Sequence, residues 1–470
     1  MRADATGEGP LYRALLHHAQ ERPDAPALAD ADHRLDYAAT LHEVDRRAAA
    51  LAASGDAWTV LDEQADGKLG FALDYLAAAR ANTPVVVAEG TALTSEIADL
   101  LRARADEVRG LGLAAPEVMF TSGSSSRAKA VLLDGHRMYG KARRINAFMG
   151  DARHATEILT LPLRHSFGLG RLRCAIAAGR GVRLVDRLES PDGLFAVADA
   201  YPSAGLALIA TQVKILLDRY PGALGGFADR LAYLEIGSEP MEAGHRRALT
   251  ALLPATRLGM HYGMTELSRA TMVDLHAPGP AGLGAGHPLP GVELAFDAGD
   301  GTGTGEDGAP EATEGEILLR GDAMLRAYVD DTGIRPVAPG SRLRTGDHGH
   351  RAADGSLVVE GRLSNVVKIL GKKVSMEETE SALRPLLAGG DCVCVASELV
   401  PGVTTLVAVV EANGPGAPDR AALHRELGAR LPAHQVPRRF VTVDRLPRLP
   451  GGKTDRRAAA ELARRRPARG

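Results

Sequence analysis

The stretch EVMFTSGSSSRAKAV, residues 117–131, joins an apolar segment to a loop suited to an anion. The apolar part ends at Met119 and Phe120 and predicts a strand, and six small hydroxylic or glycine residues follow it. Small residues let backbone N–H groups approach oxyanion oxygens, hydroxyls add donors, and Lys129 supplies a positive charge. The stretch therefore fits a polyphosphate loop, although an ordinary Ser/Gly-rich turn has the same composition.

Strand and helix patterns alternate on both sides of this loop. Apolar runs such as WTVL, PVVVA, GVRLVD, GLALIA, LAYLEIG and TRLGMHYG predict strands, with amphipathic helical patterns between them, including one over residues 95–108 and one over 136–149. ILTLPL predicts a further strand, RHSFGLG (164–170) a loop, and the residues after it a helix. This alternation predicts an α/β architecture of layered subdomains with largely parallel strands.

The pattern changes near residue 278. Glycine-rich segments such as GVELAFD and EGEILLRG predict an antiparallel, β-rich subdomain, and the acidic glycine stretch 297–316 predicts an exposed loop or hairpin. A second change near residues 361–365 predicts a boundary between a large domain, 1–363, and a small α+β domain, 364–470.

Composition limits the classes of protein. The 470 residues are 45% hydrophobic and 24% charged, with a formal net charge of -3, which gives no reason to expect a nucleic acid or an anionic membrane as partner. Three cysteines form neither a disulfide framework nor a zinc spacing, and the N-terminal segment has no apolar signal core. We expect a cytoplasmic protein, with the arginines after residue 453 on a solvated terminal helix.

Four further segments have residue types that suit a nucleotide. YGMTE (262–266) offers an aromatic ring, a hydroxyl and a carboxylate, and RTGD (344–347) places a carboxylate after a glycine turn. GRLSNVVKILG (361–371) carries an arginine at the predicted domain boundary, and LPRLPGGKTDR (446–456) carries a lysine on a Pro/Gly-rich loop. Each segment alone also fits solvated or paired loop residues.

Together, and in this order, these segments resemble the adenylate-forming enzymes, which include acyl-CoA synthetases, luciferases and the adenylation domains of nonribosomal peptide synthetases. The resemblance extends over essentially the whole chain, through residues 21–55, GSEPM, GHPLPGVEL and LPAHQVPRRFVTVDRLP. It implies a large AMP-binding domain followed by a small, mobile C-terminal domain.

The resemblance also implies ATP and Mg²⁺ as cofactors and assigns roles by position. The phosphate loop is Thr121, Ser122, Gly123, Ser124, Ser125 and Lys129. The adenine, ribose and phosphate contacts are Ser238, Glu239, Pro240, Tyr262, Thr265, Asp347 and Arg362. Glu266 is the implied magnesium ligand, Lys453 the mobile catalytic lysine that bridges the substrate carboxylate and the α-phosphate, and Ser364 the hinge.

The segment LPLRHSFGLG (161–170) resembles the part of acyl-CoA and aryl-CoA ligases that lines the acid pocket. It has no aspartate of the kind that holds an α-ammonium group, which favours an aryl or aliphatic carboxylic acid over an amino acid. The implied pocket residues are His165, Phe167, Gly168, Ser238, Gly263 and Met264, with His165 also a catalytic candidate and loop packing the alternative for His165 and Phe167. Gly371, Lys372 and Lys373 are compatible with the tunnel for CoA or for the phosphopantetheine of a carrier protein.

Several positions depart from the family pattern. Ser126, Ala128 and Ala130 replace glycine or proline in and beside the loop, and Ser364 replaces the usual hinge aspartate. The leading prediction is a stand-alone ATP-dependent acid ligase that forms an acyl or aryl adenylate and passes it to CoA or a carrier protein. Transfer to an amine and a nucleotide-binding scaffold without catalysis are alternatives, whereas a Walker-type phosphotransferase lacks its GKS or GKT sequence.

Overall fold

The computed structural model describes residues 8–88, 91–121, 129–150, 152–186, 191–277, 284–298, 312–330, 333–363, 366–369, 372–387, 390–400, 403–411, 419–448 and 454–464. The chain forms two compact units. Unit 1 comprises residues 1–294, 319–343 and 352–357, and unit 2 comprises residues 295–318, 344–351 and 358–470. The boundary predicted at 363/364 falls inside unit 2 and remains a prediction.

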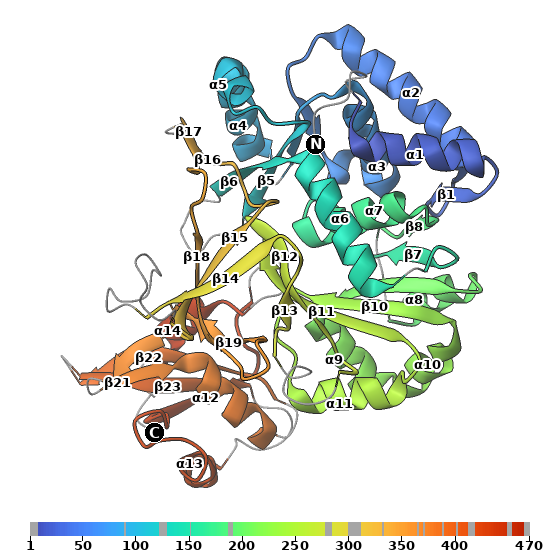
Figure 1. Cartoon of the computed structure of the whole chain (residues 1–470). Helices are drawn as coiled ribbons and strands as arrows, with labels where there is room; N and C mark the ends of the chain where they lie inside the picture. The colour runs from blue at the N-terminus through green and yellow to red at the C-terminus, as the bar shows by residue number, and fades with distance from the viewer. Residues whose placement is uncertain are drawn as a thin grey trace. The chain divides into compact units, whose positions relative to one another are not determined.

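A nine-stranded sheet forms the centre of unit 1, in the order β13-β12-β11-β10-β9-β7-β8-β1-β2 (Figure 1). Its strands are β1 (Pro26–Ala29), β2 (Arg34–Asp36), β7 (Thr156–Leu159), β8 (Val182–Leu184), β9 (Ala204–Ile209), β10 (Leu231–Gly237), β11 (Arg257–Met264), β12 (Leu267–Asp274) and β13 (His287–Pro288). Strands β1, β8, β7, β9, β10 and β11 pair in parallel, as predicted, and β2, β12 and β13 add antiparallel edges.

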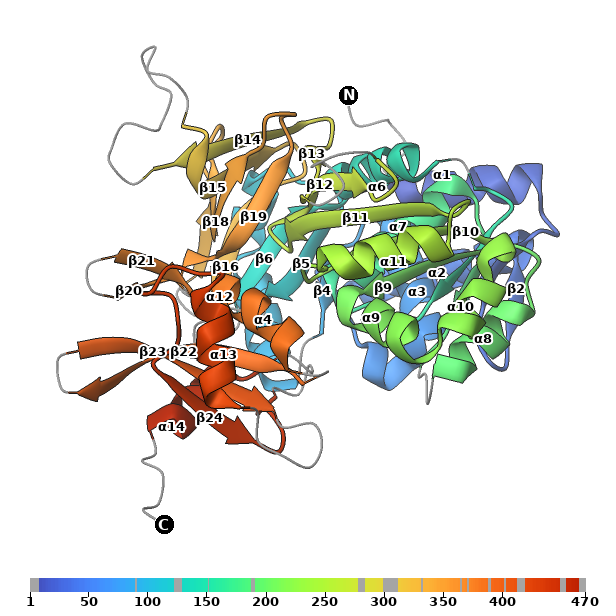
Figure 2. The ribbon, with the colours of Figure 1, turned by 90° about the horizontal axis from the view of Figure 1, so that it is seen from below.

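Helices cover both faces of this sheet. On one face lie α8 (Pro191–Asp199), α9 (Ala210–Arg219), α10 (Pro221–Gly226) and α11 (Ala243–Leu252), with α9 and α11 side by side (Figure 2). Alternate residues of β10, Leu234 and Ile236, join their apolar core. Side chains of β10 that point to the opposite face of the sheet, including Tyr233, pack against α6 (Gly135–Met149) and α7 (Ser166–Ala178). Two layers of helices therefore leave the ends of the parallel strands as the places where a site can form.

The helices near the start of the chain pack on one another. Helix α1 (Pro10–Glu21) contacts α2 (Tyr37–Ser54), α3 (Glu63–Ala81), α6 and α7. The Asp36 carboxylate accepts from the Ala39 backbone N–H and so caps α2, which ends at Gly55 in the left-handed conformation (φ 69°).

A six-stranded sheet, β17-β16-β6-β5-β4-β3, holds the segment quoted at the start of the sequence. Its strands are β3 (Thr59–Leu61), β4 (Val85–Val87), β5 (Pro116–Thr121), β6 (Lys129–Asp134), β16 (Ala327–Asp330) and β17 (Gly333–Pro336), with α4 (Thr91–Ala103) and α5 (Ala105–Gly110) between β4 and β5. Strands β5 and β6 are antiparallel, and Thr121 pairs with Lys129. The predicted phosphate loop therefore connects two antiparallel strands.

Three local predictions need correction. Strands β6 and β12 follow the quoted loop and YGMTE, and neither of them is predicted from the sequence; LSRATMVD, the sequence of β12, has a mixed polar pattern. The pattern over 95–108 forms two helices that part at Arg104. Residues 164–170 are not all loop, because α7 already begins at Ser166.

Unit 2 contains most of a four-stranded sheet, in the order β14-β15-β18-β19, and a small α+β body. The sheet strands are β14 (Val292–Asp297), β15 (Glu314–Gly321), β18 (Leu343–Arg351) and β19 (Leu357–Arg362). The remaining elements are β20 (Val366–Ile369), β21 (Lys372–Ser375), α12 (Met376–Leu383), β22 (Cys392–Val400), β23 (Val403–Glu411), α13 (Arg420–Gly428), β24 (Arg439–Val443) and α14 (Arg456–Arg464).

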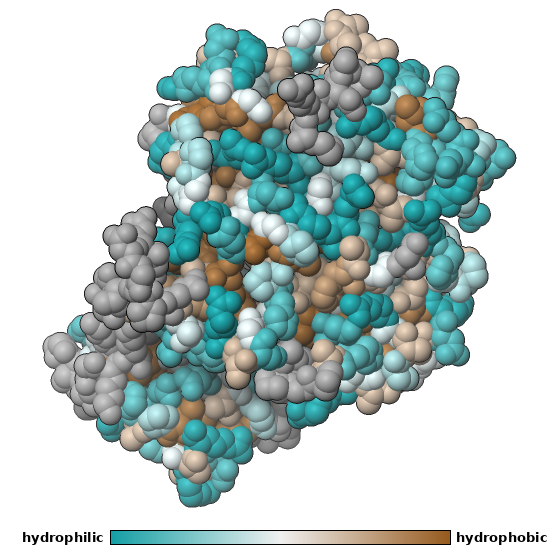
Figure 3. All heavy atoms as spheres, in the orientation of Figure 1, coloured by the Kyte–Doolittle hydropathy of each residue, from teal (hydrophilic) through white to brown (hydrophobic). Residues whose placement is uncertain are grey.

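The sheet β22-β23-β24 packs between helices. Cys392, Cys394 and Leu406 belong to the core shared with α12 and α13, whereas Val393 and Val407 belong to the core shared with α14. All three cysteines of the chain are buried and form no disulfide bond. None of the described helices is both long enough and apolar enough to cross a bilayer, and the described surface in Figure 3 is mainly hydrophilic.

Candidate active site

The carboxyl end of the nine-stranded sheet gathers most of the residues predicted for unit 1. Strands β7, β9, β10 and β11 are parallel, so the segments that follow them emerge at one edge. These segments are 160–165 after β7, Thr211 after β9, Ser238 after β10 and the β11–β12 turn. The sheet topology therefore brings together segments separated by about a hundred residues of sequence.

The β11–β12 turn presents Thr265 and Glu266. Met264 pairs with Leu267, so these two residues form the connection of a tight hairpin. The register shifts between Tyr262 and Met264, and Arg269 on the opposite strand has a φ of 45°. At this irregularity the backbone of β12 comes so close to Gly263 that a Cβ there would collide with it. Gly263 is thus required by the hairpin itself.

Glu266 lies close to the sheet that carries the quoted loop. The Leu325 backbone N–H donates to the Glu266 carbonyl at 2.8 Å. Burial raises the pKa of Tyr328 to about 12, and the neighbouring Glu266 carboxylate adds to the effect. Tyr328 is on β16 and pairs with Val131 on β6, the strand that closes the loop. Glu266 is therefore on the same side of unit 1 as the loop end at Thr121 and Lys129.

The segment after β10 has an unusual backbone. Ser238 is exposed and has a φ of 71°, a left-handed conformation that costs free energy in a residue with a side chain. Glu239 accepts hydrogen bonds from the Thr211 hydroxyl at 2.5 Å and from the Thr211 N–H at 3.2 Å. Pro240 is exposed. The carboxylate of Glu239 thus joins the ends of β9 and β10.

The acid-pocket candidates divide into exposed and packed residues. His165 is exposed and precedes α7, and its carbonyl accepts from the Leu169 N–H at 3.0 Å. Phe167 is 6% exposed, and its ring meets the His261 ring edge-on at a centroid distance of 4.6 Å. At Gly168, a Cβ would collide with the Pro162 carbonyl. Phe167 and Gly168 therefore hold the first turn of α7 against the sheet.

A buried charged cluster lies beneath this edge. Glu235 is fully buried and accepts from Arg171 Nη1 at 2.6 Å and from Arg269 Nε at 2.9 Å, and His261 Nδ1 lies 2.8 Å away. Burial alone would raise the pKa of Glu235, but Arg269 and Arg171 hold it well below its ordinary value. Burial lowers the pKa of His261, which favours its neutral form.

The cluster also sets the shape of the edge. Arg269 donates to the carbonyls of Ser166 and Phe167 at 3.2 and 3.1 Å, and its guanidinium lies 4.8 Å from the Phe167 ring centroid. Since Glu235 anchors Arg269, the carboxylate fixes the start of α7 indirectly. These residues are positioning residues for the segment that carries His165.

Two buried lysines support the same region in different ways. Lys68 donates to the carbonyls of Val185, Thr160 and Leu159 at 2.6, 2.8 and 3.3 Å, at the ends of β7 and β8. Lys141 donates to the Arg269 carbonyl at 3.3 Å, at the irregular part of β12. Burial lowers the pKa of Lys68 to about 8 and that of Lys141 to about 7.

Unit 2 brings together two of the predicted nucleotide contacts. Arg362 Nε lies 2.7 Å from an Asp347 carboxylate oxygen, and Asp347 is 5% exposed. The Asp347 N–H donates to the Thr345 hydroxyl at 3.0 Å, and that hydroxyl donates to the Ile317 carbonyl at 2.8 Å. The Arg362 N–H donates to Glu377 at 2.9 Å. A ribose bound here would meet an aspartate already paired with an arginine.

Several predicted residues lie outside the described part of the chain. They are Ser122, Gly123, Ser124, Ser125, Ser126, Ala128, Ser364, Gly371 and Lys453. Of Lys129, Lys372 and Lys373, only the backbone is described.

The described residues of unit 1 fit the implied Mg²⁺. Glu266 and Thr265 provide a carboxylate and a hydroxyl on one turn, and Mg²⁺ prefers oxygen ligands. Tyr328 adds a neutral phenol beside the Glu266 carboxylate. The donor set is thus one that suits a hard cation.

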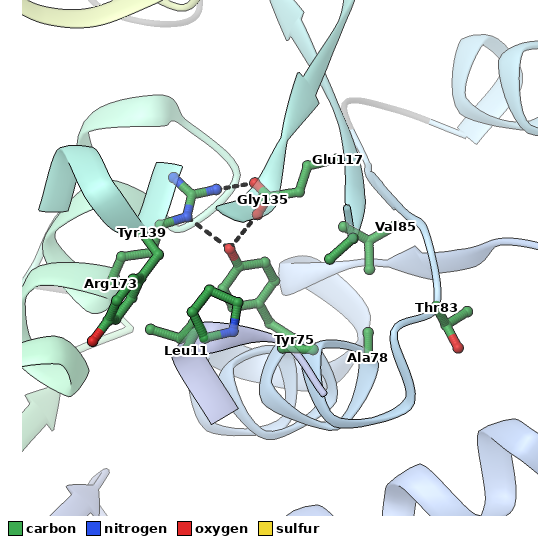
Figure 4. A pocket seen from close by; sticks show the side chains of 13 residues that line it. Leu11, Tyr75, Ala78, Thr83, Val85, Glu117, Gly135, Tyr139 and Arg173 are labelled. Atoms are coloured by element: carbon green, nitrogen blue, oxygen red, sulfur yellow. Dashed lines mark hydrogen bonds and ion pairs between the residues drawn. The ribbon is translucent and has the colours of Figure 1, made fainter. Parts of the chain in front are cut away.

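A separate cavity lies between α1, α3, β5, α6 and α7 (Figure 4). The Tyr75 hydroxyl donates to Glu117 at 2.6 Å, Arg173 Nε donates to Tyr75 at 2.7 Å, and Arg173 also pairs with Glu117. About 20 Å³ is open to the centre of a water molecule, which is room for about one water. This cavity is too small for a nucleotide and is a packing feature.

The sequence predictions missed the charged cluster and the two lysines. Glu235 interrupts the apolar strand LAYLEIG, and Arg171 and Arg173 interrupt the mainly apolar helix of residues 166–178. A charged residue within a buried pattern must find a partner, because an unpaired charge in the core is very costly. Charged residues within apolar patterns were therefore the signal from which this cluster could have been predicted.

Comparisons with known proteins identify similar sequences and folds. Residues 115–329 match the family model of the AMP-binding enzymes. AMB antimetabolite synthetase AmbB of Pseudomonas aeruginosa is 29% identical over 95% of this chain and 39% of its own length. Phenyloxazoline synthase MbtB of Mycobacterium tuberculosis is 27% identical over 96% of this chain and 34% of its own length. The chain thus spans well under half of these relatives.

Solved structures share the fold. O-succinylbenzoate coenzyme A synthetase (MenE) of Bacillus subtilis, in complex with AMP, has a TM-score of 0.74 at 20% identity, over 94% of this chain and 96% of that one. ATP-bound MatB of Rhodopseudomonas palustris has a TM-score of 0.76 at 18% identity, over 96% and 98%. The family model thus places residues 115–329 among the AMP-binding enzymes, and the solved structures share the fold over nearly the whole chain.

Proposed function

We propose that this protein is an ATP-dependent carboxylic acid ligase that forms an acyl or aryl adenylate and releases pyrophosphate. The observation that carries the proposal is the position of Thr265 and Glu266 on a tight hairpin at the carboxyl edge of the sheet, beside β16 and hence beside the strand that closes the hydroxyl-rich loop. A polyphosphate between loop and hairpin would meet backbone N–H groups, hydroxyls and a carboxylate that holds Mg²⁺.

The chemistry requires two anions to approach each other. An oxygen of the substrate carboxylate forms a bond to the α-phosphorus of ATP, the bond from that phosphorus to the bridging oxygen breaks, and pyrophosphate leaves with the electron pair. Mg²⁺, when bound, would neutralise charge on the phosphates. Lys453 is the residue we assign to the approaching carboxylate, and Asp347 with Arg362 to the ribose and its phosphate.

The charges near the acid-pocket segment favour an acid without an α-ammonium group. The Glu63 carboxylate accepts a hydrogen bond from the Arg164 backbone N–H at 3.0 Å. The Glu235 carboxylate accepts hydrogen bonds from two arginines, Arg171 and Arg269. The Phe167 and His261 rings, packed edge-on against each other, make the buried side of this segment aromatic. An aryl or aliphatic carboxylic acid therefore suits this edge better than an amino acid.

We assign a thiol as the acceptor in the second step, either that of CoA or that of a carrier protein's phosphopantetheine. The names of the similar proteins support both: MenE is a coenzyme A synthetase, and a 31% identical relative of Salinispora arenicola is described as a probable nonribosomal peptide synthetase, CymA. Mass spectrometry after incubation with ATP, CoA and an acid library would identify acid and acceptor together. A mass increase of an added carrier protein, with no acyl-CoA, would select the carrier.

The Lys453→Ala variant tests the assignment of the mobile lysine. Loss of one such charge-stabilising group lowers the rate by about 10²- to 10³-fold, so we expect that loss in acid-dependent pyrophosphate exchange with little change in ATP binding. Wild-type exchange in Lys453→Ala would show that the family role does not apply here. ATP binding without exchange by the wild-type protein would instead favour a scaffold.

A further inference from the structure

A cluster of histidine and glutamate side chains lies on one face of the four-stranded sheet in unit 2. Glu314 is on β15, His348 on β18 and Glu360 on β19, and one ligand atom from each lies within 4.8 Å of those of the other two. None of these residues has a part in the proposed ligase reaction. The cluster therefore needs an explanation of its own.

The strand geometry brings these side chains together. Residues two apart on a strand point to the same face, so His348 and His350 share a face of β18. His348 Nδ1 lies 2.8 Å from one Glu360 oxygen, and His350 Nδ1 lies 2.6 Å from the other. One carboxylate thus contacts two imidazoles from the neighbouring strand.

The part of unit 2 that the structure describes places no lysine or arginine side chain against the carboxylates of this cluster. Among the residues that the structure describes, no lysine or arginine lies within 4.0 Å of a Glu314 or Glu360 oxygen. Arg344 is on the same face of β18, but it is 2.7 Å from Asp297 and also pairs with Glu316. Two carboxylates and two imidazoles together offer both nitrogen and oxygen donors.

We propose that Glu314, His348 and Glu360 bind a divalent transition metal ion of the zinc type, with His350 as a fourth ligand. Imidazole with carboxylate suits Zn²⁺ and Co²⁺, whereas Mg²⁺ prefers oxygen ligands alone. Ligand atoms around a tetrahedral zinc ion are roughly 3.4 Å apart at bond lengths near 2.1 Å. The widest gap in the cluster, at most 4.8 Å, therefore needs to close by up to about 1.4 Å, and the 2.8 Å contact between His348 and Glu360 needs to open by about 0.6 Å. The exposed fractions of the His348 and Glu360 side chains, 19% and 39%, leave an ion a path from solvent.

Such an ion would bridge three adjacent strands and stabilise the sheet next to the ribose candidate. His348 directly follows Asp347 in β18. A ligand that binds only the folded state raises the unfolding temperature, so Zn²⁺ should stabilise the protein without ATP. This site is distinct from the Mg²⁺ candidate Glu266, which is in unit 1.

The test is a titration of the full, EDTA-treated chain with ZnCl₂ and CoCl₂ in the absence of ATP. We expect 1:1 binding by calorimetry, a visible Co²⁺ spectrum of a nitrogen-containing tetrahedral site, and a Zn²⁺-dependent rise in unfolding temperature. His348→Ala and Glu360→Gln should weaken binding by about 10- to 100-fold or more. Mg²⁺ should not displace the Co²⁺.

Matched controls separate this site from other metal-binding groups. His33→Ala removes an exposed histidine whose Nδ1 lies 3.1 Å from Asp30, and Glu266→Gln removes the Mg²⁺ candidate. Both should keep wild-type Zn²⁺ binding. If His348→Ala fails to fold by circular dichroism, the exposed Glu314→Gln variant takes its place. Absence of saturable 1:1 binding, or equal binding by the wild type and the cluster variants, would overturn the proposal.

Discussion

Lys141 provides a sharp test of the energetics of the buried region, because its environment opposes its charge. The side chain is on α6, is 1% exposed and donates to the Arg269 carbonyl at a long 3.3 Å. Burial lowers the pKa of Lys141 from 10.5 to about 7, and Arg144 acts in the same direction. At about 1.36 kcal/mol for each tenfold change in the protonation equilibrium, the buried amine costs the folded state about 4 kcal/mol at pH 7.

Methionine keeps the apolar stem of Lys141 and removes the amine. The variant loses one weak hydrogen bond, worth about 1 kcal/mol, and avoids the charge penalty. We expect Lys141→Met to raise the free energy of unfolding by about 2 to 3 kcal/mol at pH 7. This direction is unusual for a core substitution, since most core substitutions destabilise.

The lowered pKa of Lys141 makes the stability of the protein depend on pH. The folded-state pKa of Lys141 lies below that of the unfolded chain, so the unfolded state binds more protons between about pH 7 and 10.5. Wild-type stability from this group therefore rises with pH in that window, and the advantage of Lys141→Met should shrink between pH 7 and pH 9.5. Urea unfolding at both pH values measures it, with the exposed Lys214→Met as control. A variant less stable than wild type at pH 7, or an advantage independent of pH, would refute the reasoning.

Three further predictions concern the site. Lys68→Met should destabilise by about 2 to 4 kcal/mol in urea unfolding, despite a similarly lowered pKa, because three carbonyls lose their donor; unchanged stability would contradict this. Gly168→Ala should lower the free energy of unfolding by about 1 to 3 kcal/mol, and with it the unfolding temperature, because the added methyl group meets the Pro162 carbonyl. Gly222→Ala is the control and should have a far smaller effect, because the space around Gly222 is open. Asp347→Asn should weaken ATP binding by about 10- to 100-fold in calorimetry through loss of a charge-assisted hydrogen bond to ribose; wild-type affinity would remove Asp347 from the site.

The fold class and the family could be predicted from sequence because both depend on patterns along the chain. Alternating apolar and amphipathic segments indicated the parallel sheet, and the spacing of YGMTE and RTGD relative to the first loop indicated the AMP-binding enzymes. Both predictions are confirmed. The roles of Glu266, Asp347 and Lys453 remain predictions.

The rest depended on contacts between distant residues. Nothing local to LAYLEIG reveals that Glu235 meets Arg171 and Arg269, which lie 64 and 34 residues away in sequence. The start of α7 at Ser166 depends on the packing of Phe167 on His261 and on the space that Gly168 leaves for the Pro162 carbonyl. Such long-range pairs arise only when the sheet is assembled.

Acid-dependent exchange of pyrophosphate into ATP tests the central claim most directly. The account predicts exchange with at least one aryl or aliphatic carboxylic acid, dependence on Mg²⁺, and a strong loss of exchange in Glu266→Gln, while Glu314→Gln retains wild-type exchange. Exchange that is absent with every aryl, aliphatic and amino acid, or that is unaffected in Glu266→Gln, would contradict it.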